Sequence, residues 1–192
     1  MRKSVLDYIL RIYLPVTLLV VVATYTVTYF ASRNERYHVG YAPEQPINYS
    51  HELHAGKMGI DCQYCHTAVS KGRHANVPAA STCMNCHSVA RTDRPEIIKL
   101  TEYYKNDQPI PWKRVHKLPE HVYFNHSVHV NKGLDCTECH GKIQEMPVVA
   151  QVKPFMMSNC LDCHRNAPER YPHLVNLTGL KKGPENCSAC HR

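Results

Sequence analysis

Phe and Trp are scarce in this sequence, and so are segments that resemble β-strands. Its 192 residues include three Phe and one Trp, and large aliphatic residues are sparse outside one apolar run, residues 12–31. Few segments alternate apolar and polar residues as a strand does, and "PVVAQVKPF" is expected to be an extended loop. This scarcity excludes a large core built from side chains alone. A cofactor must supply most of the core, and without it the chain is not expected to fold.

No cysteine is left outside one recurring pattern. The ten Cys form five C-x-x-C pairs, and a His follows each pair at once. C-x-x-C-H is the attachment signature of c-type haem, in which two thiols add to the vinyl groups and the next imidazole reaches the iron. The covalent positions are Cys62, Cys65, Cys83, Cys86, Cys136, Cys139, Cys160, Cys163, Cys187 and Cys190, and the proximal iron ligands are His66, His87, His140, His164 and His191.

Other uses of cysteine fit this pattern poorly. A zinc ribbon needs an even number of C-x-x-C units, and a thioredoxin-like redox motif does not recur with a His each time. A disulfide framework would not place His after every second Cys. The sequence therefore predicts five covalently attached c-type haems.

The N-terminal apolar run lacks both charge and a cleavage site. Residues 12–31 are uncharged, and about 20 such residues cross a bilayer. Arg2, Lys3 and Arg11 precede the run, which predicts that the N-terminus stays inside. A cleaved signal peptide is the alternative, but the run is longer than a typical signal core and no A-x-A-like site ends it. Pro15 either kinks this helix or lies harmlessly near its first turn.

Covalent haem also fixes the compartment, because in bacteria the attachment takes place outside the cytoplasmic membrane. We therefore expect a single-pass anchor in the cytoplasmic (inner) membrane and a haem domain in the periplasm. The formal net charge is +7 and the pI about 8.9, values that would suggest nucleic acid or an anionic surface. The propionates of five haems offset that charge, so no nucleic-acid partner is predicted.

Two stretches of the chain repeat each other. "YSHELHAGKMGIDCQYCH" and "FNHSVHVNKGLDCTECH" share an H-x-x-H pair, a Gly/Lys turn and a C-x-x-C-H motif, and a second motif follows each, in "CMNCH" and "CLDCH". Such self-similarity indicates a duplicated module. The predicted parts are residues 1–33, a transmembrane signal anchor; 34–47, a linker; 48–92, di-haem module one; 93–121, a connector whose prolines oppose long helices; 122–166, di-haem module two; and 167–192, a fifth-haem segment.

This organisation predicts the fold class. We expect a mostly α multihaem cytochrome c fold with long loops, in which short helices carry the C-x-x-C-H motifs and the H-x-x-H pairs. Two tandem di-haem modules, a fifth haem and one N-terminal transmembrane helix complete it. Trp112, the only Trp, is expected to pack against a haem edge.

The H-x-x-H pairs are candidate distal ligands. His126 and His129 stand at i and i+3, about 5–6 Å apart at Cβ if they share a helix face. The axial positions of one haem lie on opposite sides of its plane, so the two histidines are expected to cap different irons. His51 and His54 would do the same in module one. The alternative is that these four are ordinary surface or core histidines.

The fifth distal ligand stays open between two candidates. His116 is one, and Met157 is the other, since a thioether ligand would raise the potential of that haem. Module one has Ala80 at the position equivalent to Met157, so Met157 is not part of the repeat. Packing is an equally good explanation of Met157. The remaining histidines are assigned to the surface or to propionate contacts: His38, His74, His121 and His173.

With these motifs in view, the chain resembles a known family. H-x-x-H before C-x-x-C-H resembles class III multihaem cytochromes. The anchor, the five motifs, "RVHKLPEHVYFNHSVHV" and "CTECHGKIQEM" look more closely like the pentahaem subunit of bacterial alternative complex III. Members often read M-G-W-C before the fourth haem, whereas this chain reads "MSNC", so only Met157 matches there. The resemblance implies a quinol-oxidising membrane complex with integral membrane subunits, an iron–sulfur subunit and a monohaem cytochrome as partners.

Three functions compete. The first is an electron conduit that passes electrons from quinol oxidation toward a soluble periplasmic acceptor, without a substrate site in this chain. The second is a quinol dehydrogenase of the NapC/NrfH type that feeds a periplasmic reductase, with the quinol site at the anchor. The third, a catalytic multihaem reductase, needs a vacant iron site, often with a C-x-x-C-K motif that this sequence lacks.

Overall fold

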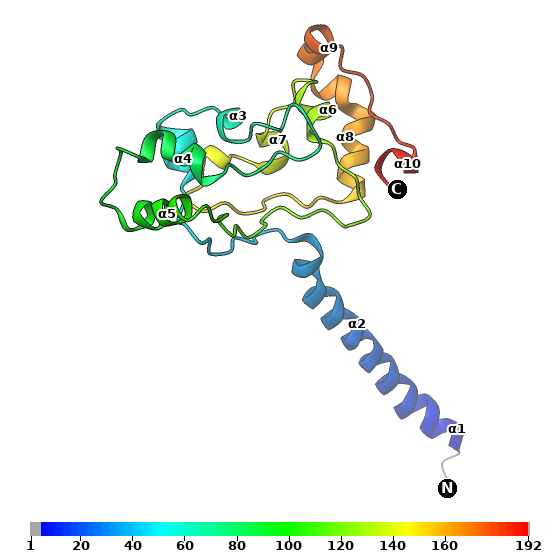
Figure 1. The fold of residues 1–192 in the computed structure, drawn as a ribbon. Helices are drawn as coiled ribbons and strands as arrows, with labels where there is room; N and C mark the ends of the chain where they lie inside the picture. The colour runs from blue at the N-terminus through cyan, green and yellow to red at the C-terminus, as the bar shows by residue number, and fades with distance from the viewer. Residues whose placement is uncertain (1–4, 192) are drawn as a thin grey trace. The chain divides into compact units, whose positions relative to one another are not determined.

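The computed structural model describes residues 5–191. Within this range, only the backbone of residues 32–37 is described. The chain divides into two compact units, Met1–His38 and Val39–Arg192. Figure 1 traces both as ribbons. Arg2 and Lys3, on which the predicted orientation of the anchor depends, lie outside the described residues.

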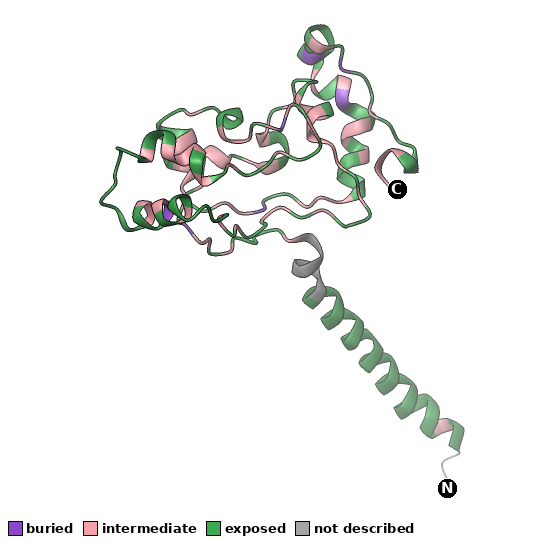
Figure 2. Ribbon diagram, viewed as in Figure 1, coloured by how far each residue is buried: buried purple, intermediate pink, exposed green. Residues whose placement is uncertain are grey.

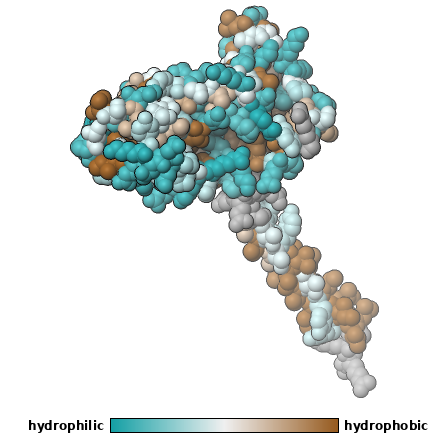
Figure 3. Space-filling view, viewed as in Figure 1, coloured by the Kyte–Doolittle hydropathy of each residue, from teal (hydrophilic) through white to brown (hydrophobic). Residues whose placement is uncertain are grey.

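From Val5 to Tyr37 the first unit is a helical rod. It consists of α1 (Val5–Tyr8), a π-helical turn η1 (Ile9–Tyr13) and α2 (Leu14–Tyr37). Within Val5–Ala31, the most apolar stretch of 18 residues has a mean hydropathy of 2.0, and none of that stretch is buried within the protein. Its side chains form an apolar surface in Figure 3. One helix is thus long and apolar enough to span a membrane, as the sequence predicts.

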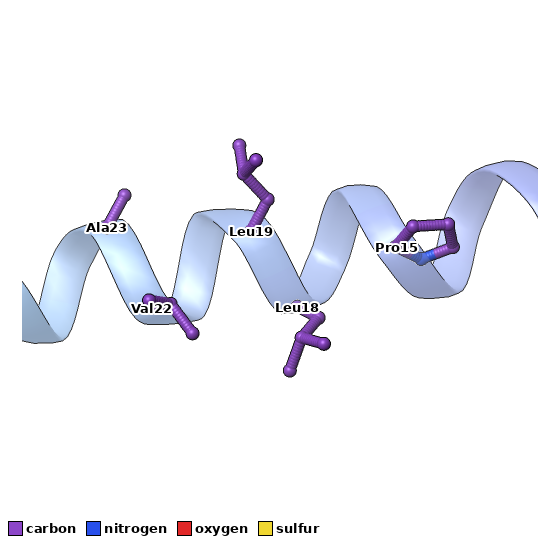
Figure 4. Close-up of a pocket in the computed structure, with 5 residues that line it drawn as sticks. All are labelled: Pro15, Leu18, Leu19, Val22 and Ala23. Carbon is purple, nitrogen blue, oxygen red and sulfur yellow. The ribbon is translucent and has the colours of Figure 1, made fainter.

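Pro15 lies just after the π-helical turn. The Leu14 N–H donates to the Ile9 carbonyl, five residues back, before regular α-helix resumes. Such a turn rearranges the hydrogen bonds next to a residue that has no N–H to give. Pro15, Leu18, Leu19, Val22 and Ala23 line a shallow apolar hollow on the rod (Figure 4).

The second unit is helical with long loops, as the sequence predicts. Its elements are η2 (Glu52–Lys57), α3 (Cys62–Cys65), α4 (Ala80–His87), α5 (Pro95–Lys105), α6 (His126–Val130), α7 (Thr137–His140), η3 (Ile143–Glu145), α8 (Met157–Arg170), α9 (Pro172–Thr178) and α10 (Cys187–Cys190). No β-strand occurs in residues 5–191, and one isolated bridge joins Val122 to His191.

The segment 147–155 forms no helix or strand, as expected of a loop. Gln151, at its centre, is 1% exposed. Its backbone N–H donates to the Tyr41 carbonyl and its carbonyl accepts from the Gly40 N–H, while its side-chain oxygen accepts from the Lys117 N–H. Gln151 therefore ties the linker and the connector to module two.

The connector differs from its prediction. It contains α5, a helix of 11 residues, although its prolines were expected to oppose long helices. Pro95 opens this helix at its first turn, where the missing N–H costs nothing. Leu100, 3% exposed, is its buried anchor.

The apolar core of the second unit is small. Figure 2 shows that most residues of this unit are exposed or half-buried. Among the described residues, the buried apolar side chains are Ile47, Val69, Leu100, Ala167, Leu174 and Leu180. A unit of this length normally buries far more apolar surface. The structure thus agrees with a core in which a cofactor replaces side chains.

Candidate haem-binding site

Four of the five C-x-x-C-H motifs lie on or at the end of helices of four to eight residues, and the fourth motif lies within α8, which has 14. Asp61 precedes the first, and its carboxylate accepts the Gln63 N–H at 2.7 Å. Asp135 precedes the third and accepts the Thr137 N–H at 2.8 Å. An aspartate cap accepts a hydrogen bond from a backbone N–H that such a short helix leaves unpaired. The same local device thus starts the helix that carries the first C-x-x-C-H motif of each module.

Most motif histidines, and most of their candidate partners, use Nδ1 in the same way. A backbone carbonyl lies within 2.6–3.2 Å of Nδ1, and because a carbonyl can only accept, the proton must be on Nδ1. That tautomer leaves Nε2 unprotonated, which suits a metal ligand. The histidines held in this way are His54, His66, His87, His126, His129, His164 and His191.

The spacing between imidazoles tests whether iron would fit. Two metal–nitrogen bonds of about 2 Å, with about 1 Å from each nitrogen to its ring centre, separate two axial rings by about 6 Å. The ring centres of His54 and His87 are 6.2 Å apart. Those of His126 and His140 are 6.3 Å apart, and those of His129 and His164 are 6.1 Å apart. Three distal candidates therefore lie at the separation that a six-coordinate haem iron requires.

The two histidines of the H-x-x-H pair in module two lie opposite two different motifs. His126 lies opposite His140 of the third motif, with ring planes 5° apart. His129 lies opposite His164 of the fourth, with planes 25° apart. In module one His54 faces His87 of the second motif, with planes 66° apart. After burial, His66 of the first motif has the largest effect on the lowered pKa of His51, so the two imidazoles are neighbours.

Burial keeps several of these imidazoles neutral. Burial, with smaller effects of neighbouring histidines, lowers the pKa of His51 to about 4 and that of His140 to about 4. Burial also lowers the pKa of His129 and of His116. A neutral imidazole is the form that ligates a metal.

Three buried polar atoms have no partner among the described residues: His51 Nδ1, His116 Nε2 and Trp112 Nε1. Buried polar groups are normally hydrogen-bonded, so each orphan points to a missing partner. A haem iron or propionate beside them would supply it. Together with the ring spacings and the small core, these atoms show that the chain fits haem.

The two modules pack against each other reciprocally. The Glu52 N–H of module one donates to the Met146 carbonyl of module two at 3.0 Å, and the Ser127 N–H donates back to the Gly72 carbonyl at 3.1 Å. Alignment of the repeats pairs Glu52 with Ser127 and Gly72 with Met146. The duplicated halves therefore exchange equivalent contacts, as the subunits of a two-fold dimer do.

A second pair of contacts repeats this exchange. Gly56 lies so close to the Gln144 carbonyl that a Cβ on Gly56 would overlap it. The equivalent residue in module two, Asn131, donates its side-chain amide to the Ser70 carbonyl at 3.1 Å. Gln144 and Ser70 are themselves equivalent in the repeat. Equivalent residues of the two repeats thus form the closest contacts between the modules.

An aromatic ring lies between the two histidines of each H-x-x-H pair. Tyr49 stacks on His54 at 4.4 Å and meets His51 edge-on at 4.8 Å. Phe124 stacks on His129 at 4.5 Å and meets His126 edge-on at 4.8 Å. The sequence interpretation overlooked these rings, although the repeat places both two residues before the first histidine.

Thiols of different motifs are neighbours in space, and the order of the motifs in space differs from their order along the chain. Burial raises the pKa of the Cys83 thiol, and nearby Cys65 raises it further. Burial raises the pKa of Cys136 to about 11, with Cys62 as the largest charged contributor. Burial raises the pKa of Cys139 too; Lys153 lowers it and Cys163 raises it. In the same way burial raises the pKa of Cys160, and Cys190 adds to that.

These neighbours put the motifs in the spatial order second, first, third, fourth, fifth. Figure 1 agrees within the second unit: α4 lies toward one end, α3 and α7 are central, and α8 and α10 lie toward the other end. The reciprocal packing brings the first and third motifs together at the centre.

The two candidates for the fifth distal ligand, His116 and Met157, have different surroundings. The ring of His116 is 4.4 Å from that of His140 and 6.0 Å from that of Phe155, beside the third motif. Met157, at the start of α8, is 65% exposed. The histidine beside the fifth motif is His121, whose ring centre is 5.3 Å from that of His191.

The zinc alternative finds no support in the arrangement of ligands. Among the described residues, no three His, Cys, Asp or Glu side chains converge as a metal-binding group. The ten cysteines are free of disulfides. The arrangement is instead one of imidazole pairs beside cysteine pairs, which defines c-type haem sites.

Comparison with known proteins agrees with this class. A family model described as "Cytochrome c7 and related cytochrome c" matches residues 122–192. The chain is also 30% identical over 158 residues to the "Menaquinone reductase, multiheme cytochrome c subunit" of Nitratidesulfovibrio vulgaris, with 77% of this chain and 68% of that subunit covered. The chain therefore belongs to the multihaem c-type cytochromes, a family of electron-transfer proteins with covalently bound haem.

Proposed function

We propose that this chain is a membrane-anchored pentahaem electron conduit of a quinol-oxidising complex. In this proposal it conducts electrons to a soluble periplasmic acceptor, with residues 1–33 as the anchor in the cytoplasmic membrane. Its partners are integral membrane subunits that carry the quinol site, an iron–sulfur subunit and a monohaem cytochrome, as in alternative complex III. The relative from Nitratidesulfovibrio vulgaris is named as a subunit of a menaquinone reductase, which supports a quinone-linked membrane complex.

The observation that carries the proposal is the series of motifs. Each motif has a thiol that affects the pKa of a thiol in the next motif of the series, from Cys83 at one end to Cys190 at the other, and the ribbon places the helices that carry the motifs in the same order (Figure 1). Haem iron, when bound in these motifs, supplies one-electron oxidation and reduction. A series with two distinct ends is what a conduit between a donor and an acceptor requires.

The chain's own residues then have definite tasks. The ten Cys hold the porphyrin edges, and the five motif histidines ligate from one face. His51 with His66, His54 with His87, His126 with His140 and His129 with His164 are the proposed axial pairs. Backbone carbonyls that accept from Nδ1 fix the ring orientation and strengthen the ligand. Met157 and His116 remain to be tested as ligands beside them.

The test is to purify the native membrane complex with a tag on this chain. We expect about five covalent haems per chain, co-purifying membrane and iron–sulfur subunits, and reduction of the haems by menaquinol only in the intact complex. Fewer than five covalent haems on the wild-type chain would contradict the pentahaem conduit.

A second function, a quinol dehydrogenase of the NapC/NrfH type, is favoured by the single anchor helix of this chain. The two proposed functions predict different results in one assay, menaquinol oxidation by the isolated chain. The isolated, haem-loaded chain in detergent would then oxidise menaquinol by itself, whereas the conduit would not.

A further inference from the structure

We propose that His121 is the distal iron ligand of the fifth motif, Cys187–His191. The inference rests on the proposed function, because it requires haem on that motif. Neither the internal repeat nor an H-x-x-H pair marks His121, so only its position in the fold identifies it.

Backbone contacts hold residues 121–123 against the fifth motif. The Tyr123 N–H donates to the Cys190 carbonyl at 2.8 Å, and Val122 forms a β-bridge with His191. His191 Nδ1 lies 3.2 Å from the His121 carbonyl, to which it donates. The residue that would be the distal ligand thus also orients the proximal one, and the two histidines cannot separate without breaking several hydrogen bonds.

The rings are placed like the other axial pairs, but closer. The planes of His121 and His191 differ by 24°, close to the 25° between His129 and His164. Their centres are 5.3 Å apart, against 6.1 Å for that pair. His121 precedes an extended segment rather than sitting within a helix, so a small side-chain rotation can open the distance that iron requires.

The competing residues are less well placed. The ring of His116 packs edge-on against His140 at 4.4 Å, which assigns it to the surroundings of the third motif. His173, on α9, packs against Tyr171 at 6.5 Å. Met157 is the closest rival, because α8 brings Cys160 near Cys190, and the experiment below therefore includes it. A His ligand in place of a thioether predicts a low potential for the fifth haem.

The decisive experiment uses the purified native complex and two variants, His121→Ala and Met157→Leu. Alanine keeps the backbone carbonyl that accepts from His191. We expect His121→Ala to keep the wild-type number of covalent haems but to lose one low-spin ferric EPR signal, gain one high-spin signal and bind carbon monoxide when reduced. Added imidazole should restore the low-spin state. Met157→Leu should retain every low-spin signal.

A milder variant protects the test against misfolding. His121→Met should stay low-spin and raise the potential of one haem, since thioether ligation favours the reduced state. If His121→Ala leaves all the haems low-spin, or if Met157→Leu creates the high-spin signal, the inference is wrong. A wild-type chain with fewer than five covalent haems would instead contradict the proposed function, so the two failures are distinguishable.

Discussion

Module one, residues 48–92, and module two, residues 122–166, place equivalent histidines with nearly equal spacing. The distances between His54 and His87 and between His129 and His164 differ by 0.1 Å (6.2 and 6.1 Å). The angles between the ring planes differ far more, 66° against 25°. The duplication has therefore preserved the separation that an iron requires, while the orientation of the rings has diverged.

The surroundings of the first distal histidine have also diverged. His126 Nδ1 donates to the Arg73 carbonyl of module one at 2.7 Å, whereas His51 Nδ1 is buried without a partner in the described residues. The residue equivalent to Arg73 is Pro147. A hydrogen bond to the far nitrogen of a ligating imidazole raises the basicity of the ligand, so His126 and His51 would bind an iron with different strengths.

The largest effect is expected when either histidine of the pair on α6, His126 or His129, is removed as an iron ligand. His126→Ala should convert the haem of the third motif to high spin, and His129→Ala should do so for the fourth, because each ring faces a different proximal histidine. EPR and carbon monoxide binding of the purified complex measure this. Identical spectral changes in the two variants would contradict the assignment of the pair to separate irons.

The interface between the modules should respond to a single methyl group. Gly56→Ala pushes a Cβ into the Gln144 carbonyl, and overpacking of this kind typically costs about 1–3 kcal/mol. We expect a lower temperature of irreversible unfolding for the haem-loaded chain. Gly72→Ala is the matched control, because a Cβ there meets open space; its effect should stay within about 0.5 kcal/mol. Equal effects of the two variants would show that the modules do not pack as described.

The rings that precede each H-x-x-H pair should act through their shape. Tyr49→Leu removes the surface against which His54 stacks and should cost about 0.5–1.5 kcal/mol, with broadened low-spin EPR signals from the first two motifs. Tyr49→Phe turns the ring into that of module two and should leave the spectra unchanged. If the phenylalanine variant behaves like the leucine variant, the hydroxyl rather than the ring is what matters.

Patterns in the sequence predicted the parts of this structure that short-range chemistry determines. Hydropathy predicted the apolar helix, and the scarcity of strand patterns predicted a mostly helical second unit. The five haems inferred from the cysteine spacing and the two di-haem modules inferred from the repeat stay predictions. The nearness of His121 to His191 was not predictable, because 70 residues separate them and the contact arises from backbone bonds of an irregular loop. The spatial order of the motifs likewise depends on how the halves pack, which no local pattern encodes.

The smallest expected effect concerns the two aspartate caps. Asp61 accepts the Gln63 N–H, whereas Asp135 accepts both the Thr137 N–H and the Thr137 hydroxyl, the latter at 2.5 Å. Because a lost cap costs about 1 kcal/mol and a further hydrogen bond adds to that, Asp135→Ala should lower stability more than Asp61→Ala. When Asp135→Ala is introduced into a chain that already carries Thr137→Ala, its effect on stability should equal that of Asp61→Ala, because the extra hydroxyl contact is then absent from module two. Thermal unfolding of the haem-loaded chain measures all three, and an equal loss in the two aspartate variants would mean that the extra hydroxyl contact contributes nothing.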